Sequence, residues 1–168
     1  MAGAMYPGEH AATMPDRAAA IRADTGEALT YRALDAQSNR LAQLLHAKGL
    51  RRGDHMALLM ENRPEYLVTW FALAKIGCVS ALINTQASGD ALRHALAVTG
   101  AQRLFVGTEC NERLERTPGL AGTLPVHVVP DAAADATPAN CARLEEQALT
   151  HPDTNPDPQL RRDVIGSS

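Results

Sequence analysis

The stretch HMALLMENRPEYLVTWFALAKIGCVSALIN, residues 55–84, decides the fold. Its first six residues form a short, apolar run bounded by turn signals, as expected of a strand covered on both faces. ENRPEYLVTWFALAKIG then predicts a helix, because Pro64 suits the first helical turn, Glu65 lies near the positive helix end and Gly77 ends it. CVSALIN is the next strand. A single helix between two strands forces parallel pairing through a right-handed crossover.

The sequence before this stretch predicts a helix and a β-hairpin. LTYRALDAQSNRLAQLLHAKGL, residues 29–50, has leucines at helical spacing, with Thr30 as N-cap and Gly49 as C′ residue. Upstream of it, apolar runs around Ile21 and before Thr30 flank a turn at Gly26, where glycine supplies the positive φ that such turns need.

The sequence after it continues the alternation of helices and strands. A helix, a strand, a short helix and a fourth strand are expected at SGDALRHALAVTG (88–100), QRLFVG (102–107), NERLER (111–116) and PVHVVP (125–130). The pattern therefore predicts an α/β fold with an open, mostly parallel sheet, flanking helices and an N-terminal β-hairpin.

Length and composition allow one ordinary core. The chain has 168 residues, of which 45% are hydrophobic. We divide it into an irregular N-terminus (1–16), an α/β unit (17–129) and a connection (130–168). Half of the ten prolines lie in the connection, and NCARLEEQALT (140–150) predicts one short helix within it.

Composition also excludes several classes of function. A formal net charge of -3 and a pI of about 6.0 offer no basic surface for nucleic acid. The N-terminus lacks the basic start and apolar run of a secretory signal, so export is not expected. The apolar stretch 66–83 contains Lys75, and a buried helix with a buried strand explains it better than a membrane span. Cys78, Cys110 and Cys141 lie far apart, which fits free thiols in a reducing compartment.

No motif for a self-contained nucleotide, metal or nucleophile site is present. There is no GxGxxG after a strand, no GxxxxGK[ST] and no GxSxG elbow. The six histidines never pair at i, i+3 or i, i+4, so they are expected to be surface or packing residues. Cys78 is expected to be inert packing. Glu145 and Glu146 are expected to be solvated, because successive helix positions do not share a face.

The loop ENRPE, residues 61–65, allows two explanations. It follows a strand, and open α/β sheets bind ligands at the carboxyl ends of their strands. Alternatively, Asn62 or Arg63 caps the next helix, Pro64 begins its first turn and Glu65 faces its dipole. The second explanation accounts for every residue, and we prefer it.

Four features occur in a set order within residues 17–107. They are the LTYRAL helix start, the RRGD turn, the MENRPEY loop and the AKIGCVSALIN strand. As a set they resemble the N-terminal part of the AMP-forming acyl-CoA synthetases, in the adenylate-forming superfamily. WFALAKIGCVSALINTQASGDALRHAL is most similar to the branch of fatty-acid transport proteins and very-long-chain acyl-CoA synthetases. The resemblance implies an incomplete N-terminal subdomain of the adenylate-forming fold.

The resemblance also implies a two-step reaction for the full-length protein. ATP and Mg²⁺ convert a long- or very-long-chain fatty acid to an acyl-adenylate with loss of pyrophosphate, and coenzyme A then displaces AMP. AMP is a good leaving group, whereas the hydroxide of a carboxylate is a poor one. Fatty acid, ATP, Mg²⁺ and coenzyme A are therefore expected ligands of the full-length enzyme, and no cofactor is expected for this chain alone.

In this family, a tail such as NPDPQLRRDVIGSS, residues 155–168, leads to a Ser/Thr/Gly-rich loop that holds the ATP phosphates. The sequence ends before such a loop, so we assign no catalytic, cofactor-binding or metal-binding residue to any numbered position. We expect an inactive, marginally stable piece of a cytoplasmic protein. Peripheral association with a membrane and contact with the remainder of the synthetase are left open.

Two other functions fit the same residues. One is a stand-alone α/β binding or interaction module that kept the scaffold and lost the ligase chemistry. The other is an adenylation domain that loads a carrier protein instead of coenzyme A.

Overall fold

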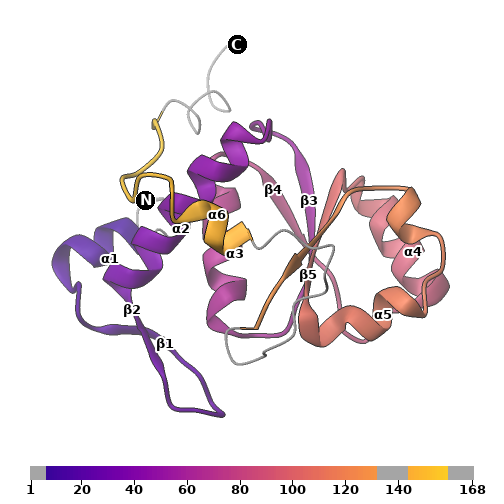
Figure 1. The fold of residues 1–168 in the computed structure, drawn as a ribbon, viewed down its shortest axis with the longest axis horizontal. Helices are drawn as coiled ribbons and strands as arrows, with labels where there is room; N and C mark the ends of the chain where they lie inside the picture. Colours follow the sequence, from indigo (N-terminus) through magenta and orange to yellow (C-terminus); the bar gives the residue numbers. More distant parts are fainter. Residues whose placement is uncertain (1–6, 132–143, 159–168) are drawn as a thin grey trace.

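The computed structural model describes residues 7–131 and 144–158, which form three layers (Figure 1). A parallel sheet of strand order β4-β3-β5-β6 lies in the middle. Helices α2, α3 and α6 cover one face, and α4 and α5 cover the other. The four strands are β3 (His55–Leu59), β4 (Val79–Leu82), β5 (Arg103–Gly107) and β6 (Val126–Val129).

The remaining elements surround this sheet. An antiparallel hairpin of β1 (Ala18–Ile21) and β2 (Ala28–Thr30) projects from the body (Figure 1). The helices are α1 (Pro7–Thr13), α2 (Tyr31–Ala47), α3 (Pro64–Lys75), α4 (Gly89–Thr99), α5 (Asn111–Glu115) and α6 (Leu144–Ala148), with short 3-10 turns η1 (Thr108–Cys110) and η2 (Leu120–Gly122).

The predicted parallel sheet and N-terminal hairpin are confirmed. Every pairing in the four-stranded sheet is parallel. The hairpin turns through Gly26 at a φ of 73°. Helix α6 falls within the short helix expected at 140–150, although residues 132–143 and 159–168 lie outside the described part of the chain. The apolar stretch 66–83 is divided into a helix and a strand, as expected.

Helix α2 begins and ends at the predicted residues. The Thr30 hydroxyl accepts a hydrogen bond from the Ala33 amide at 3.2 Å, and Gly49 leaves the helix with a φ of 92°. Leu34, Leu41 and Leu45 form a buried stripe on the sheet-facing side. Burying each leucine contributes about 2 kcal/mol, so this stripe holds α2 against the sheet.

Strand β4 is less buried than predicted. We expected a buried strand starting at Cys78, but β4 is an edge strand, and Val79 and Leu82 are 46% and 53% exposed. The topology explains the difference. The chain crosses from β4 over β3 to β5, so β4 keeps a single neighbour in the described sheet. Cys78 itself is buried, under the end of α3.

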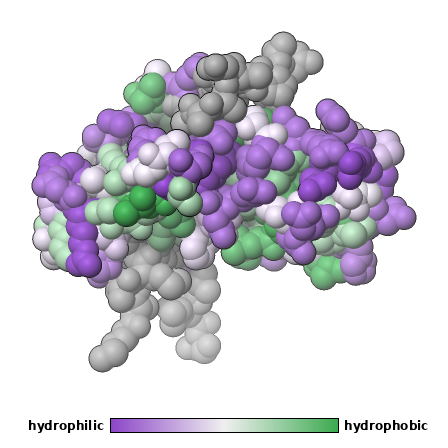
Figure 2. All heavy atoms as spheres, turned by 90° about the horizontal axis from the view of Figure 1, so that it is seen from below, coloured by the Kyte–Doolittle hydropathy of each residue, from purple (hydrophilic) through white to green (hydrophobic). Residues whose placement is uncertain are grey.

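Helix α3 was expected to be a buried helix, and this is wrong for one flank. Val68, Ala72 and Leu73 are buried, whereas four large side chains are only half-buried: Tyr66, Leu67, Trp70 and Phe71. No described helix is both long and apolar enough to cross a membrane. Figure 2 shows that the exposed apolar side chains gather in separate patches on the face seen there.

Helix α1 lies within the stretch expected to be irregular. Pro7 begins it, Glu9 lies in its first turn and the ring of His10 lies 4.9 Å from that of Tyr31, measured between centroids. A helix of 7 residues has too few turns for a visible apolar period. Packing against α2 stabilises it, and the sequence pattern does not reveal that contact.

His127, on β6, is a polar side chain within the sheet. Its ring stacks on Phe105 at a centroid distance of 5.1 Å. Among the described residues, its Nε2 is buried without a hydrogen-bond partner. Burial, and then the positive charges of Arg103 and Lys48, lower the pKa of His127. The folded protein therefore favours the neutral ring.

This lowered pKa predicts how acid affects stability. The unfolded chain binds a proton at His127 near its ordinary pKa of about 6.5, before the folded chain does, so stability falls as pH decreases below that value. His127→Phe keeps the ring stack and should flatten this decrease between about pH 7 and pH 5 in urea unfolding. His94→Phe, at an exposed position on α4, is the control. If His127→Phe loses stability with acid as steeply as the wild type, this role of His127 is wrong.

Candidate functional site

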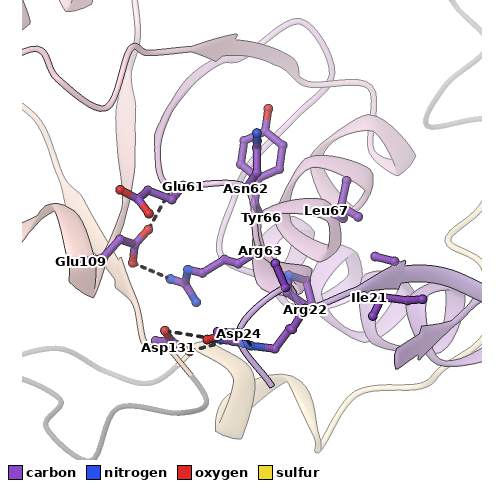
Figure 3. Close-up of a pocket in the computed structure, with 13 residues that line it drawn as sticks. Ile21, Arg22, Asp24, Glu61, Asn62, Arg63, Tyr66, Leu67, Glu109 and Asp131 are labelled. Carbon is purple, nitrogen blue, oxygen red and sulfur yellow. Dashed lines mark hydrogen bonds and ion pairs between the residues drawn. The ribbon is translucent and has the colours of Figure 1, made fainter. Parts of the chain in front are cut away.

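The candidate site lies at the carboxyl edge of the sheet. The chain leaves β3 toward β4 on one side and later reaches β5 on the other side of β3, so the carboxyl ends of β3 and β5 form a topological switch point. An open pocket of about 490 Å³ lies beside it (Figure 3). Its walls come from the hairpin, from the loop after β3 and from residues that follow β5 and β6. We call it the carboxyl-edge pocket.

Arg63 joins the three loops that follow β3, β5 and β6. Its side chain is 7% exposed, and its terminal nitrogens donate to the carbonyls of Val129 at 2.8 Å and Pro130 at 2.9 Å. It also forms ion pairs with Glu65 at 3.1 Å and Glu109 at 3.2 Å. A planar guanidinium with five donors suits such a junction, because it can serve several acceptors at once.

Arg22 holds the hairpin to the same edge. Its side chain is 8% exposed and pairs with Asp24 at 3.0 Å on its own hairpin and with Asp131 at 2.9 Å after β6. The hydrogen bonds that Arg22 donates to Asp24 and then to Asp131 raise the pKa of Arg22, and the bond from Arg22 lowers the pKa of Asp24. Both partners stay charged at neutral pH. Figure 3 shows Arg63 pointing toward Glu109, and Arg22 beside Asp24 and Asp131.

The carboxylate of Glu109 fills the switch point. It accepts a hydrogen bond from the Glu61 amide at 2.9 Å and folds back over Gly107, where any Cβ atom would collide with it. Four acidic and two basic side chains line the pocket, so its charge disfavours a phosphate. Within residues 7–131 and 144–158, no group of three or more His, Cys, Asp and Glu side chains could hold a metal ion.

The preferred explanation of ENRPE is confirmed for the helix start, and its cap lacks a side-chain hydrogen bond. Pro64 begins α3, Glu65 lies in its first turn and Arg63 occupies the N-cap position, as expected, but the Arg63 side chain makes no capping hydrogen bond. Asn62 is exposed and lines the pocket. One sequence signal could have revealed the cluster: an acidic residue follows the end of three predicted strands, at Glu61, Glu109 and Asp131, and parallel strands end at one edge.

The two described cysteines suit packing better than nucleophilic chemistry. Burial raises the pKa of Cys78 to about 12, with Asp54 adding to the effect. Burial, followed by Glu109 and Glu61, raises the pKa of Cys110 to about 11. Both thiols are therefore protonated at neutral pH. Cys141 and the side chain of Glu145 lie outside the described residues, and Glu146 is exposed.

Comparison with known proteins identifies similar chains. The sequence matches the family described as AMP-binding enzyme over residues 8–164. It is 36% identical to long-chain fatty acid transport protein 6 of Mus musculus over 123 residues, which are 73% of this chain and 19% of that protein. The chain thus spans about a fifth of the length of this curated relative.

Two solved structures share the fold. A fatty acyl CoA synthetase of Mycobacterium tuberculosis has a TM-score of 0.69 at 25% identity, covering 90% of this chain and 28% of that one. The N-terminal subdomain of NpsA from Klebsiella oxytoca, solved with anthranilyl-AMSN, has a TM-score of 0.61 at 30% identity, covering 71% of this chain and 29% of that one.

The junction at Arg63 gives a stability prediction. Arg63→Met should lower the free energy of unfolding by about 3–5 kcal/mol, because Glu109 loses its ion pair, Glu65 is left with Arg22 at 3.7 Å, and two carbonyls after β6 lose their donor. Urea unfolding measures the loss. The matched control is Arg93→Met on α4, whose half-exposed side chain lies 3.7 Å from Asp90 and should contribute about 0–0.5 kcal/mol. Equal losses in the two variants would show that Arg63 does not join the loops as described.

Proposed function

Because the chain belongs to the AMP-binding enzyme family, we propose that it is the N-terminal part of an ATP-dependent long- or very-long-chain fatty acyl-CoA synthetase. Two likenesses support the substrate class. One relative is a long-chain fatty acid transport protein, and one structural neighbour is a fatty acyl CoA synthetase that matches 90% of this chain. A cytoplasmic location belongs to the proposal, and peripheral contact with a membrane is left open.

The proposed activity of the complete protein joins a fatty acid to coenzyme A. The fatty carboxylate attacks the α-phosphorus of ATP and releases pyrophosphate, which gives an acyl-adenylate. The coenzyme A thiol then attacks the acyl carbon and releases AMP. ATP, Mg²⁺ and coenzyme A belong to the complete protein in this proposal, and we assign none of them to a numbered residue of this chain.

The observation that carries the scaffold role is the internal pairing at the carboxyl edge. Glu109 occupies the switch point, where an open α/β sheet would receive a ligand, and Arg63 and Arg22 are both engaged with the chain's own carboxylates. A triphosphate brings strong negative charge and does not fit among these acidic side chains. We therefore propose that this chain supports the active site and does not perform ligase chemistry alone.

A stand-alone binding module is the second candidate. The pocket has an apolar side formed by Ile21, Tyr66 and Leu67, and Ile21 is 65% exposed on the hairpin. This wall could contact an apolar ligand or partner. Saturable binding of such a ligand by a stable monomer would favour the module over the synthetase scaffold.

The scaffold proposal predicts an inactive chain. Purified protein mixed with ATP, Mg²⁺, coenzyme A and a long-chain fatty acid should release no pyrophosphate, because the described pocket repels phosphate. A pyrophosphate-release assay and mass spectrometry for acyl-CoA measure this, with a complete acyl-CoA synthetase as the positive control. Formation of acyl-CoA by the purified chain would refute the scaffold role.

A further inference from the structure

The segment after α6 lies along helix α2 as an extended piece of chain. Residues 151–158, HPDTNPDP, contain three prolines and no regular element among the described residues. We call this segment the strap. In Figure 1 it is the yellow trace beside α2. Such a proline-rich stretch cannot hold itself in place through a hydrogen-bond ladder, so its position depends on side-chain contacts.

A buried lysine lies beneath the strap. Lys75, at the end of α3, is 1% exposed, and its ammonium donates to the Asp35 carboxylate at 2.8 Å and to the Asn155 side-chain oxygen at 2.7 Å. A buried ammonium is costly unless it is paired and hydrogen-bonded. Asp35 neutralises the charge, and Asn155 supplies a further acceptor from the strap.

Further contacts fix the same part of the strap. The buried Asn39 amide donates to the Asp153 carbonyl at 2.7 Å and to Asp35 at 3.1 Å. Arg40 forms an ion pair with Asp153 at 3.2 Å, with 31% and 57% of the two side chains exposed. Exposed pairs of this kind contribute less than a hydrogen bond to a buried charge. The contact to the buried charge of Lys75 is therefore a stronger hold on the strap than the Arg40–Asp153 pair.

Helix α1 covers the cluster from another side. A Cβ atom on Gly8 would lie 3.3 Å from the Asp35 carboxylate and 3.7 Å from the Asn155 amide nitrogen. Lys75 thus lies where α1, α2, α3 and the strap meet. Asn155 is itself an exposed residue, so it can leave this junction without unfolding the core.

We propose that Lys75 is a positioning residue that fixes the strap, and with it residue 158, on α2. The inference rests on the proposed function in one respect: in a synthetase, the following chain would carry the loop that binds the ATP phosphates. Fixing the strap would then set where that loop begins. The docking itself can be tested without any activity.

The lysine content of the chain makes the test direct. Lys48 and Lys75 are the two lysines of the sequence, and Lys48 is exposed whereas Lys75 is buried. Acetylation with an N-hydroxysuccinimide ester, followed by peptide mass spectrometry, therefore compares Lys75 with an internal reference in the same molecule. In the wild type, Lys48 should be acetylated much faster than Lys75.

Removing the strap's acceptor should expose the lysine. Asn155→Ala should speed acetylation of Lys75 by about tenfold or more, because a hydrogen bond to a charged group opposes local opening by at least that factor. Lys48 should be acetylated at an unchanged rate. Thr154→Ala is the matched control, since the contact of Thr154 with α2 runs through its backbone carbonyl, which accepts from Gln43 at 3.4 Å. This control should leave Lys75 protected.

A conservative variant separates positioning from general stability. Asn155→Asp keeps an oxygen acceptor for the ammonium and should keep Lys75 protected, and the melting temperature of all three variants should stay close to that of the wild type. The proposal is overturned if Asn155→Ala leaves Lys75 as protected as before. It is also overturned if Thr154→Ala or Asn155→Asp exposes Lys75 equally, or if exposure occurs only with loss of the whole fold. A failure of the ligase proposal would change none of these readouts.

Discussion

The carboxyl edge of the sheet depends on the buried guanidinium of Arg63. Parallel strands can be aligned by apolar packing alone, but the loops that leave them carry polar groups that need partners. Arg63 serves two carbonyls after β6 and two carboxylates at once. Because these partners follow different strands, one side chain links the loops that leave β3, β5 and β6.

This internal pairing also limits what the chain can do at its switch point. In open α/β folds the crevice at the switch point is where a ligand meets backbone amides. Here the Glu61 amide is taken by Glu109, and the same carboxylate pairs with Arg63. The charges of Arg63 and Glu109 at this edge therefore pair with each other. Such internal pairing suits a scaffold for chemistry carried out elsewhere in a longer protein.

Local patterns were enough to predict most of the fold. The stripe of Leu34, Leu41 and Leu45, the Thr30 cap and the glycines at helix ends act over a few residues, and each lies where the sequence indicated. The contacts that such local patterns could not predict join residues far apart in the sequence. Arg63 reaches Val129 across 66 positions, and Lys75 reaches Asn155 across 80. The edge position of β4 was missed for a related reason, since strand order is set by crossovers and not by a strand's own residues.

The central claim is that this chain is the N-terminal scaffold of a fatty acyl-CoA synthetase. Sequencing the source DNA and its transcript beyond the codon for Ser168 tests it most directly. The account predicts an in-frame continuation into a strand and a Ser/Thr/Gly-rich loop able to hold the ATP phosphates. A stop codon directly after Ser168 in the transcript would contradict it and would favour a stand-alone binding module.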